Sequence, residues 1–349
     1  MKKNLILAFS CMMLLSSCGG QPSSSEAPLS EDASSVATES SSASEAYDFK
    51  WVTPTGAPTL AFYDEGNNDN WVSASNPAEV VVPSFAANSY DAIVFDGVSG
   101  LNLMTKNAKA ANYKLARWIN NLGFYVVSLK HTKEELTSWN PSWTIDAFVK
   151  TGNCARVLMD LAKNSWNYGD ISSQTTFETG LDAVVSNVPT NGYDFFVLAD
   201  PAYTTLKGKL GDKLHDIYNL NEEWAHYHNG MAIPSAGLFV NAAKYEAHTA
   251  AYTEFLNKTD DRLTALVEQP QKAADALKEY AKDARHVSSD GTLIKFGFAS
   301  TMAEKLPVLQ KTNKFGFLKK GAVADNKAVA NEFSKALGGK EFASSMFLA

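Results

Sequence analysis

Cysteine is scarce in this chain of 349 residues, which contains only Cys11, Cys18 and Cys154. Cys11 lies inside an apolar N-terminal run, and Cys18 is the residue that a lipid anchor would use. Cys154 is then the only thiol of the folded part, so no disulfide can form within that part. Stability must come from a hydrophobic core, which a chain with 45% hydrophobic residues can supply in one or two domains.

The sequence also lacks the signatures of common enzymes. It contains no P-loop, no G-x-G-x-x-G after a strand, no G-x-S-x-G and no H-E-x-x-H. Cys154, near an expected helix start, could be an activated thiol, but a lone cysteine is more often a small buried residue. Four histidines lie near Glu222 and Glu223 along the chain without the spacing of a metal site: His215, His226, His228 and His248. We therefore expect neither an enzyme, nor a cofactor, nor a metal site.

Basic residues are fewer than acidic ones: the sequence has 31 Lys and Arg and 38 Asp and Glu, which gives a formal net charge of −7. A nucleic acid needs a basic face, so nucleic acid is excluded as an expected partner.

Long hydrophobic runs are absent too, and the apolar run from Leu5 to Leu15 is too short to span a bilayer. Lys2 and Lys3 precede the run, and Leu15-Ser16-Ser17-Cys18-Gly19 follows the pattern of a lipoprotein signal. An ordinary secretory signal or a core helix are the alternatives. Cleavage after residue 17 would leave Cys18 to carry a diacylglycerol and an amide-linked acyl chain such as palmitate. The expected location is the extracytoplasmic face of the cell membrane, with the lipid anchor as the only contact with the membrane.

Residues 18–47 form a segment rich in serine, with five acidic residues and no Lys or Arg between Gly19 and Ala46. Such a segment cannot bury enough apolar surface to fold. We expect a disordered tether, with an adhesive or glycosylated stalk as the alternative.

From Tyr47 onwards, apolar strand patterns alternate with helical patterns, which predicts open α/β sheets. The predicted strands are 49–52, 79–82, 91–95, 113–119, 124–129, 145–149, 193–198 and 233–240. The predicted helices include 59–65, 155–162, 177–185, most of 242–284, and 326–337. We expect one lobe from residues 48–130 and 241–349, and a second lobe from residues 131–240.

Two turns repeat the same local pattern, in which Thr-Gly joins a strand to a helix start. They are Thr55-Gly56-Ala57-Pro58, the Thr55 turn, and Thr151-Gly152-Asn153, the Thr151 turn. Unpaired N–H groups at a helix start and a threonine hydroxyl can grip a polar or anionic group, although plain helix capping explains each turn alone. Further candidates follow two other apolar strands, at the edge where α/β sheets place ligands: Asp96, Gly97 and Ser99, and Asp200 and Tyr203. Turn formation alone also explains Asp, Gly and Pro there.

The chain resembles the solute-binding lipoproteins of ABC importers in its lipoprotein signal around Cys18, its tether and its two Thr-Gly turns. The return strand Ile233–Val240 and the closing Asn313–Phe317 support the resemblance, which covers about Phe49 to Leu337. It is nearest to the type II periplasmic-binding fold, in the branch for nitrate, sulfonates and thiamine precursors.

The resemblance implies two α/β lobes, each an open sheet flanked by helices, with a hinge between them and a ligand in the cleft. It places ligand contacts at Thr55, Gly56, Ala57, Asp96, Gly97, Thr151, Gly152, Asn153 and Asp200. The implied function is capture of a small polar, anionic or heteroaromatic solute by a monomer, and its delivery to an ABC permease and its ATPase. An exported enzyme on the same fold and a structural or adhesive surface lipoprotein are the competing classes.

Overall fold

The computed structural model describes residues 47–121, 123–289, 291–297, 306–310 and 315–348, all of which belong to the unit Ala46–Ala349. The expected signal peptide (1–17) and the expected tether (18–47) lie outside the described residues, except for Tyr47. The Tyr47 hydroxyl donates to Asp91 Oδ1 at 2.8 Å, and its ring stacks on His248. Tyr47 is therefore part of the folded body. Within the described ranges, no helix has the length and apolar character needed to cross a membrane.

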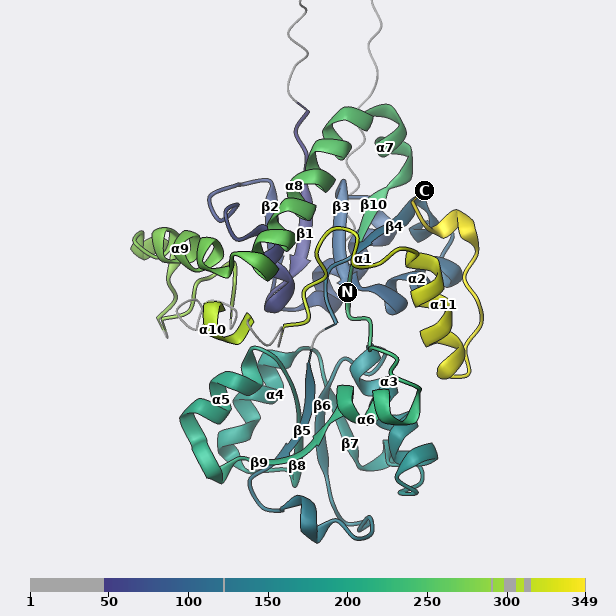
Figure 1. Ribbon diagram of the computed structural model, residues 1–349, viewed down its shortest axis with the longest axis vertical. Coiled ribbons are helices and arrows are strands. Elements are labelled where there is room, and N and C mark those ends of the chain that lie inside the picture. Colours follow the sequence, from purple (N-terminus) through teal and green to yellow (C-terminus); the bar gives the residue numbers. More distant parts are fainter. Residues whose placement is uncertain (1–46, 122, 290, 298–305, 311–314, 349) are drawn as a thin grey trace, which may run out of the picture. The chain divides into compact units, whose positions relative to one another are not determined.

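The described strands form two five-stranded mixed sheets (Figure 1). The first sheet has the order β2 (Trp71–Ala74), β1 (Trp51–Pro54), β3 (Ala92–Asp96), β10 (Ala236–Asn241) and β4 (Tyr113–Trp118). The second sheet has the order β7 (Thr175–Glu178), β6 (Ile145–Phe148), β8 (Phe195–Ala199), β5 (Phe124–Ser128) and β9 (His215–Asn219). In both sheets the first three strands are parallel and the fourth is antiparallel to its neighbours. The expected α/β fold of two lobes, each a sheet with its helices, is confirmed.

Helices lie on both faces of each sheet (Figure 1). Those of the first lobe are η1 (Ala57–Phe62, a 3-10 helix), α1 (Pro77–Ala87), α2 (Gly97–Lys106), α7 (Ala242–Ala247), α8 (Thr249–Glu268), α9 (Pro270–Tyr280), α10 (Leu306–Gln310) and α11 (Asn326–Ala336). Those of the second lobe are α3 (Asn153–Asp160), α4 (Leu181–Asn187), α5 (Ala202–Leu210) and α6 (Leu220–Tyr227). Covered sheets need apolar residues on both faces, and all five residues of β8 are buried, with Phe195 and Phe196 in different core clusters.

Two strands lie in the opposite sheet from the one expected. Residues 124–128, expected in the first lobe, form β5 of the second sheet, and residues 236–241, expected at the end of the second lobe, form β10 of the first. A short connection between two apolar strands usually makes a hairpin, which is why β4 and β5 were expected to share a sheet. Here residues 119–121 and 123 belong to a crossing between the sheets instead, because Ile119 N–H donates to Ala236 O and Ser235 N–H donates to Asn120 O.

A closing segment, Phe315–Leu318, runs beside this crossing. Asn121 N–H donates to Gly316 O at 2.8 Å and Leu318 N–H donates to Ile119 O at 2.9 Å. Gly316 has φ +56°, and a Cβ there would lie 2.1 Å from Asn121 O. Only glycine fits this approach of two backbones.

Three further expectations about local structure were wrong. Residues 79–82 were expected as a strand because of three consecutive valines, but they lie within α1, which Pro77 opens at its first position. The edge strands β2 and β7 were not expected as strands, and Phe177 was assigned to a helix. Tertiary packing decides these cases, since Val81 and Phe85 lie one helical turn apart and are fully buried.

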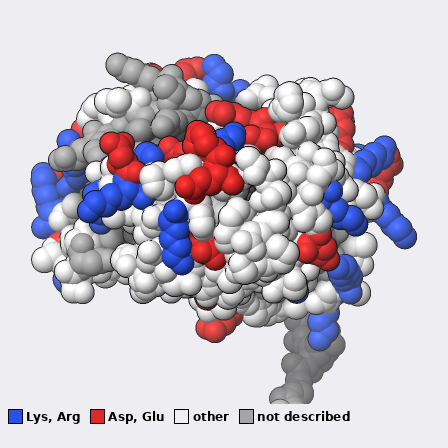
Figure 2. All heavy atoms as spheres, turned by 90° about the horizontal axis from the view of Figure 1, so that it is seen from below, with Lys and Arg blue, Asp and Glu red and all other residues white. Residues whose placement is uncertain are grey.

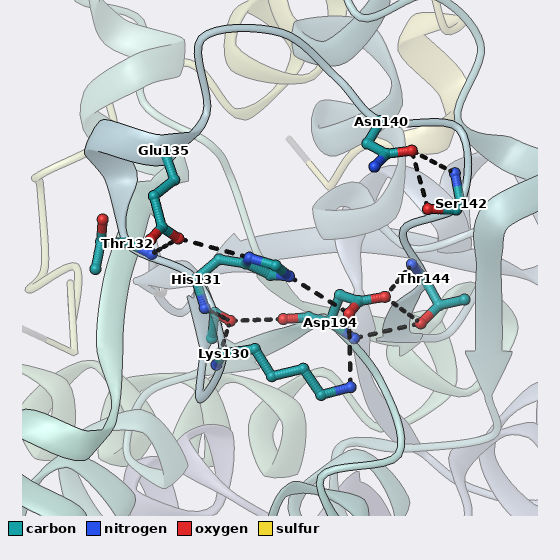
Figure 3. A network of polar contacts seen from close by, with 9 residues as sticks. Lys130, His131, Thr132, Glu135, Asn140, Ser142, Thr144 and Asp194 are labelled. Carbon is teal, nitrogen blue, oxygen red and sulfur yellow. Dashed lines mark hydrogen bonds and ion pairs between the residues drawn. The ribbon is translucent and has the colours of Figure 1, made fainter.

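Two buried or half-buried carboxylates hold loops in place. Asp91 is 2% exposed and accepts hydrogen bonds from Tyr47, Tyr252, the Lys50 backbone and Lys244 Nζ. In the second lobe, Figure 3 shows side chains converging on Asp194, which accepts from the backbone and hydroxyl of Thr144 and pairs with Lys130 and His131. Burial alone would raise the pKa of Asp194, but the hydrogen bonds from Thr144 and the charge of Lys130 outweigh it and hold the pKa below its ordinary value.

The surface is mixed in charge on the face that Figure 2 shows, where acidic and basic side chains are interspersed among uncharged ones.

Candidate functional site

A cavity of about 160 Å³ is lined by the loops at the carboxyl ends of the parallel strands of both sheets. From the first lobe come the loops after β1, β2 and β3, with Thr55–Pro58, Ser75, Pro77 and Asp96. From the second lobe come the loops after β6, β7 and β8, with Val149, Gly152–Cys154, Gly180–Asp182, Asp200 and Pro201. This edge of an open α/β sheet is where ligands usually bind.

Seven of the residues expected at a site line this cavity: Thr55, Gly56, Ala57, Asp96, Gly152, Asn153 and Asp200. The Thr55 turn and the Thr151 turn thus lie at one common cavity although about a hundred residues separate them in the sequence. The local pattern of strand, polar turn and helix start identified both turns.

Four expected residues do not line the cavity, and each has a structural contact instead. Gly97 packs against the Trp118 ring, which would lie 2.1 Å from a Cβ at this position. Ser99 Oγ donates to the backbone oxygen of Thr151 at 2.7 Å. Tyr203 stacks on Tyr125 with 3.8 Å between ring centroids. The Tyr203 hydroxyl donates to Asp216 Oδ1.

Asp96 joins the two lobes at the cavity. Its Oδ1 accepts from Ser99 N–H at 2.8 Å and so caps α2, while its Oδ2 accepts from Asn153 N–H, the first residue of α3, at 2.9 Å. Asn153 Nδ2 in turn donates to Pro234 O at 2.6 Å. Side chains and backbone of the two lobes are therefore connected by hydrogen bonds beside the cavity.

These bonds correct one part of the expected chemistry. The helix-start N–H of Asn153 was expected to be open to an anionic ligand, but Asp96 already occupies it. The N–H of Gly56 in the other turn donates to Phe296 O at 3.3 Å. An anion would find these two backbone donors already used.

Most of the lining is apolar, and its charged groups are acidic. Asp96, Asp182 and Asp200 contribute carboxylates, and the described residues of the lining include no Lys, Arg or His. Burial raises the pKa of Asp96 and of Asp182 above their ordinary values. Asp200 is 1% exposed and accepts hydrogen bonds from the hydroxyls of Tyr125 and Thr204.

Cys154 also lines the cavity, and its thiol is not activated. It is 3% exposed, and burial together with the neighbouring charge of Asp96 raises its pKa well above the ordinary value. A nucleophilic cysteine needs the opposite shift.

The sequence reasoning missed Ser75 and Asp182 because it missed the strands that precede them, β2 and β7. It also missed Val149, whose φ of +47° is rare for a β-branched residue. The weak signals available were Asn76-Pro77, a helix start, and Gly180-Leu181-Asp182, a glycine followed by an acidic first turn.

The two lobes and the shared cavity define a class, the two-lobed α/β fold of solute-binding proteins. A structure described as an ABC transporter from Parabacteroides distasonis is 16% identical over 86% of this chain and 98% of that chain, with a TM-score of 0.55. The ligand-binding component of an ABC-type import system from Staphylococcus aureus, solved with zinc bound, is 11% identical over 86% and 96%, with a TM-score of 0.62. The periplasmic aliphatic sulphonate-binding protein from Escherichia coli is 10% identical over 84% and 86%, with a TM-score of 0.54.

At these identities the likeness shows the fold alone. No protein-family model matches the chain, and no curated protein matches it significantly in sequence. Among the described residues, no group of three or more His, Cys, Asp or Glu side chains is placed to hold a metal ion.

Proposed function

We propose that this protein is an extracytoplasmic solute-binding lipoprotein of an ABC importer, which captures a small polar solute and delivers it to a permease. The observation that carries the proposal is the cavity that equivalent loops of both lobes line together. Its volume of about 160 Å³ is below the roughly 300 Å³ of sites for drug-sized ligands, which favours a small solute.

The similar structures support this function rather than an enzymatic one, since two are named as parts of ABC transport or import systems and the third as a periplasmic binding protein. The branch for nitrate, sulfonates and thiamine precursors stays an expectation from the sequence, and the sulphonate-binding neighbour agrees with it in fold. The acidic lining favours a neutral or cationic member of the polar solutes over an anionic one.

In this proposal two connections between the lobes act as the hinge. One contains residues 119–121 and 123, and the other is the connection from α6 to β10, residues 228–235. Closing the lobes removes water from the solute and completes the hydrogen bonds that Asp96 and Asn153 make across the cavity. The closed form is the one that a permease and its ATPase would recognise, so binding and signalling come from one motion. The strained Val149 lies at the cavity wall, where such strain is often found at ligand sites.

A thermal-shift screen of thiamine precursors, sulfonates, nucleobases, amino acids and amines tests the binding function. The best ligand should then bind at least about tenfold more weakly to Leu181→Trp, which fills the cavity, than to the unchanged protein. Leu210→Trp is the matched control, because Leu210 is a half-buried helix residue outside the lining. Failure of every solute class to bind, or equal weakening by both variants, would refute the proposed site.

The lipid anchor is tested separately. Cells that express the chain with Cys18→Ser should release it from the membrane fraction, because no lipid could then be attached. Mass spectrometry of the unchanged protein should find the acylated Cys18 as its first residue. An unmodified N-terminus would leave solute binding in place and remove the lipoprotein assignment.

A further inference from the structure

We propose that the cavity binds a small organic cation, a protonated amine on a short apolar body, an inference that rests on the proposed solute-binding function. The sequence alone is compatible with an anionic, a neutral or a heteroaromatic solute. The charges, acceptors and aromatic rings around the cavity decide between these classes.

Asp182 is the first reason. It lies in the first turn of α4 at the cavity wall, and no described residue donates a hydrogen bond to its carboxylate or forms an ion pair with it. A desolvated carboxylate without a partner is unfavourable, which is the cause of its raised pKa. A cationic N–H donor would supply both the missing charge and the missing hydrogen bonds.

Asn153 is the second, independent reason. This side chain is fully buried and lines the cavity, and its Oδ1 accepts no hydrogen bond from any described residue. A buried acceptor without a donor costs free energy, and because Oδ1 is itself covered in this form, a ligand would reach it only when the lobes open. Asp96 from the first lobe and Asp200 from the second add carboxylates to the lining, although their oxygens already accept hydrogen bonds within the protein.

The apolar part of the lining fits the apolar body of such a cation. Phe95, Phe124 and Phe148 line the cavity, and the rings of Phe124 and Phe148 have centroids 6.3 Å apart. Aromatic faces attract organic cations. Prolines and aliphatic side chains complete the wall, as expected for a site that recognises an alkyl group next to a charged head.

The test uses the full chain and three probes that share a butyl body and differ in the head group: n-butylammonium, n-butanol and butanesulfonate. Calorimetry at pH 7 should show n-butylammonium binding at least about tenfold more tightly than the other two, since a hydrogen bond to a charged group is worth that ratio or more. Asp182→Asn should remove most of this preference and leave the affinity for n-butanol unchanged. Asp182→Glu should retain it.

Asp212→Asn is the matched control, because Asp212 is exposed and outside the lining. Unfolding temperatures of all variants establish that they are folded. The inference is overturned if n-butanol or butanesulfonate binds the unchanged protein as tightly as n-butylammonium, or if Asp182→Asn leaves the preference intact. Both results would leave solute binding standing, whereas a library of cations, neutral solutes and anions without a single binder would remove the proposed function itself.

Discussion

Replacing Asp96 by Ser should loosen the contact between the lobes and leave α2 capped. The carboxylate now accepts two backbone hydrogen bonds, from Ser99 in its own lobe at 2.8 Å and from Asn153 in the other lobe at 2.9 Å. Serine is among the best N-cap residues, so the first bond survives the substitution. Its single oxygen cannot also reach Asn153, so the bond between the lobes is lost.

The magnitude follows from the kind of bond. A hydrogen bond to a charged group contributes about 1.5–3 kcal/mol. Because Asp96 is half-buried, we take the lower end, about 1.5 kcal/mol. A difference of about 1.4 kcal/mol is a factor of ten, so the population of the open form should rise roughly tenfold.

Cys154 provides the assay. Its thiol lines the cavity and is buried, so a thiol reagent such as iodoacetamide should reach it only when the lobes open. When opening and closing are fast compared with labelling, the labelling rate is proportional to the open population. Mass spectrometry of the peptide that contains Cys154 should therefore show labelling roughly ten times faster in Asp96→Ser.

Removing the charge of Asp96 also lowers the thiol pKa, which by itself would speed labelling. Ser99→Ala separates the two effects, since it removes the bond from Ser99 Oγ to Thr151 O and keeps the charge. We expect a rise of a few-fold for this neutral bond and none for the exposed control Ser142→Ala. Unchanged labelling in both Asp96→Ser and Ser99→Ala would refute the idea that these bonds hold the lobes together.

Three further predictions concern stability. Gly316→Ala should lower the free energy of unfolding by about 2 kcal/mol or more, because the new Cβ would overlap the backbone of Asn121. Gly321 also has a positive φ, but a Cβ there would meet no neighbouring atom, so Gly321→Ala should cost only about 1 kcal/mol. Denaturant melts of both variants measure the difference. Asp194→Asn should lower stability above the unfolded pKa of about 4, because the depressed folded pKa of Asp194 stabilises the protein there. The effect of the substitution should disappear as the pH falls through the folded pKa of Asp194. An unchanged dependence of stability on pH in the acid range would contradict this. Asp91→Ala should lower the free energy of unfolding by about 3–5 kcal/mol, because it leaves the hydrogen-bond donors around a buried carboxylate unpaired. A decrease of less than about 1 kcal/mol would show that the carboxylate is dispensable.

The loops after β1, β3, β6 and β8 could be located from the sequence because their chemistry is local. Each follows an apolar strand with residues that a turn or a helix start requires, and the strand ends gather at one edge of a sheet. Asp96 and Asp200 were found in this way. The role of Asp96 was not, since its partner Asn153 lies 57 residues away and no local pattern encodes that bond.

The second gap in the sequence reasoning has a different cause. β2 and β7 are four-residue edge strands with half-exposed residues, so neither an apolar run nor a clean alternation marks them. Missing β7 meant missing Asp182. Likewise β4 and β5 carry the alternation of any paired strand, and only the contacts of residues 119–121 with the returning chain assign them to different sheets.

The distribution of carboxylates over the two lobes connects the charge of the solute with closure. Asp96 belongs to the first lobe, and Asp182 and Asp200 belong to the second, so bringing the lobes together moves like charges towards one small cavity. Repulsion between them opposes closure in the absence of a ligand, and it acts against the attraction of Asp96 to the Asn153 N–H and to the charge of Arg156 in the second lobe. A cation bound in the cavity between them offsets this repulsion, and the charge of Asp96 adds to the effect only in the closed form, where its lobe approaches the other. A ligand shifts an equilibrium by its differential affinity for the two states. A cationic solute would therefore drive closure, and a neutral solute of the same size would bind without driving it to the same extent.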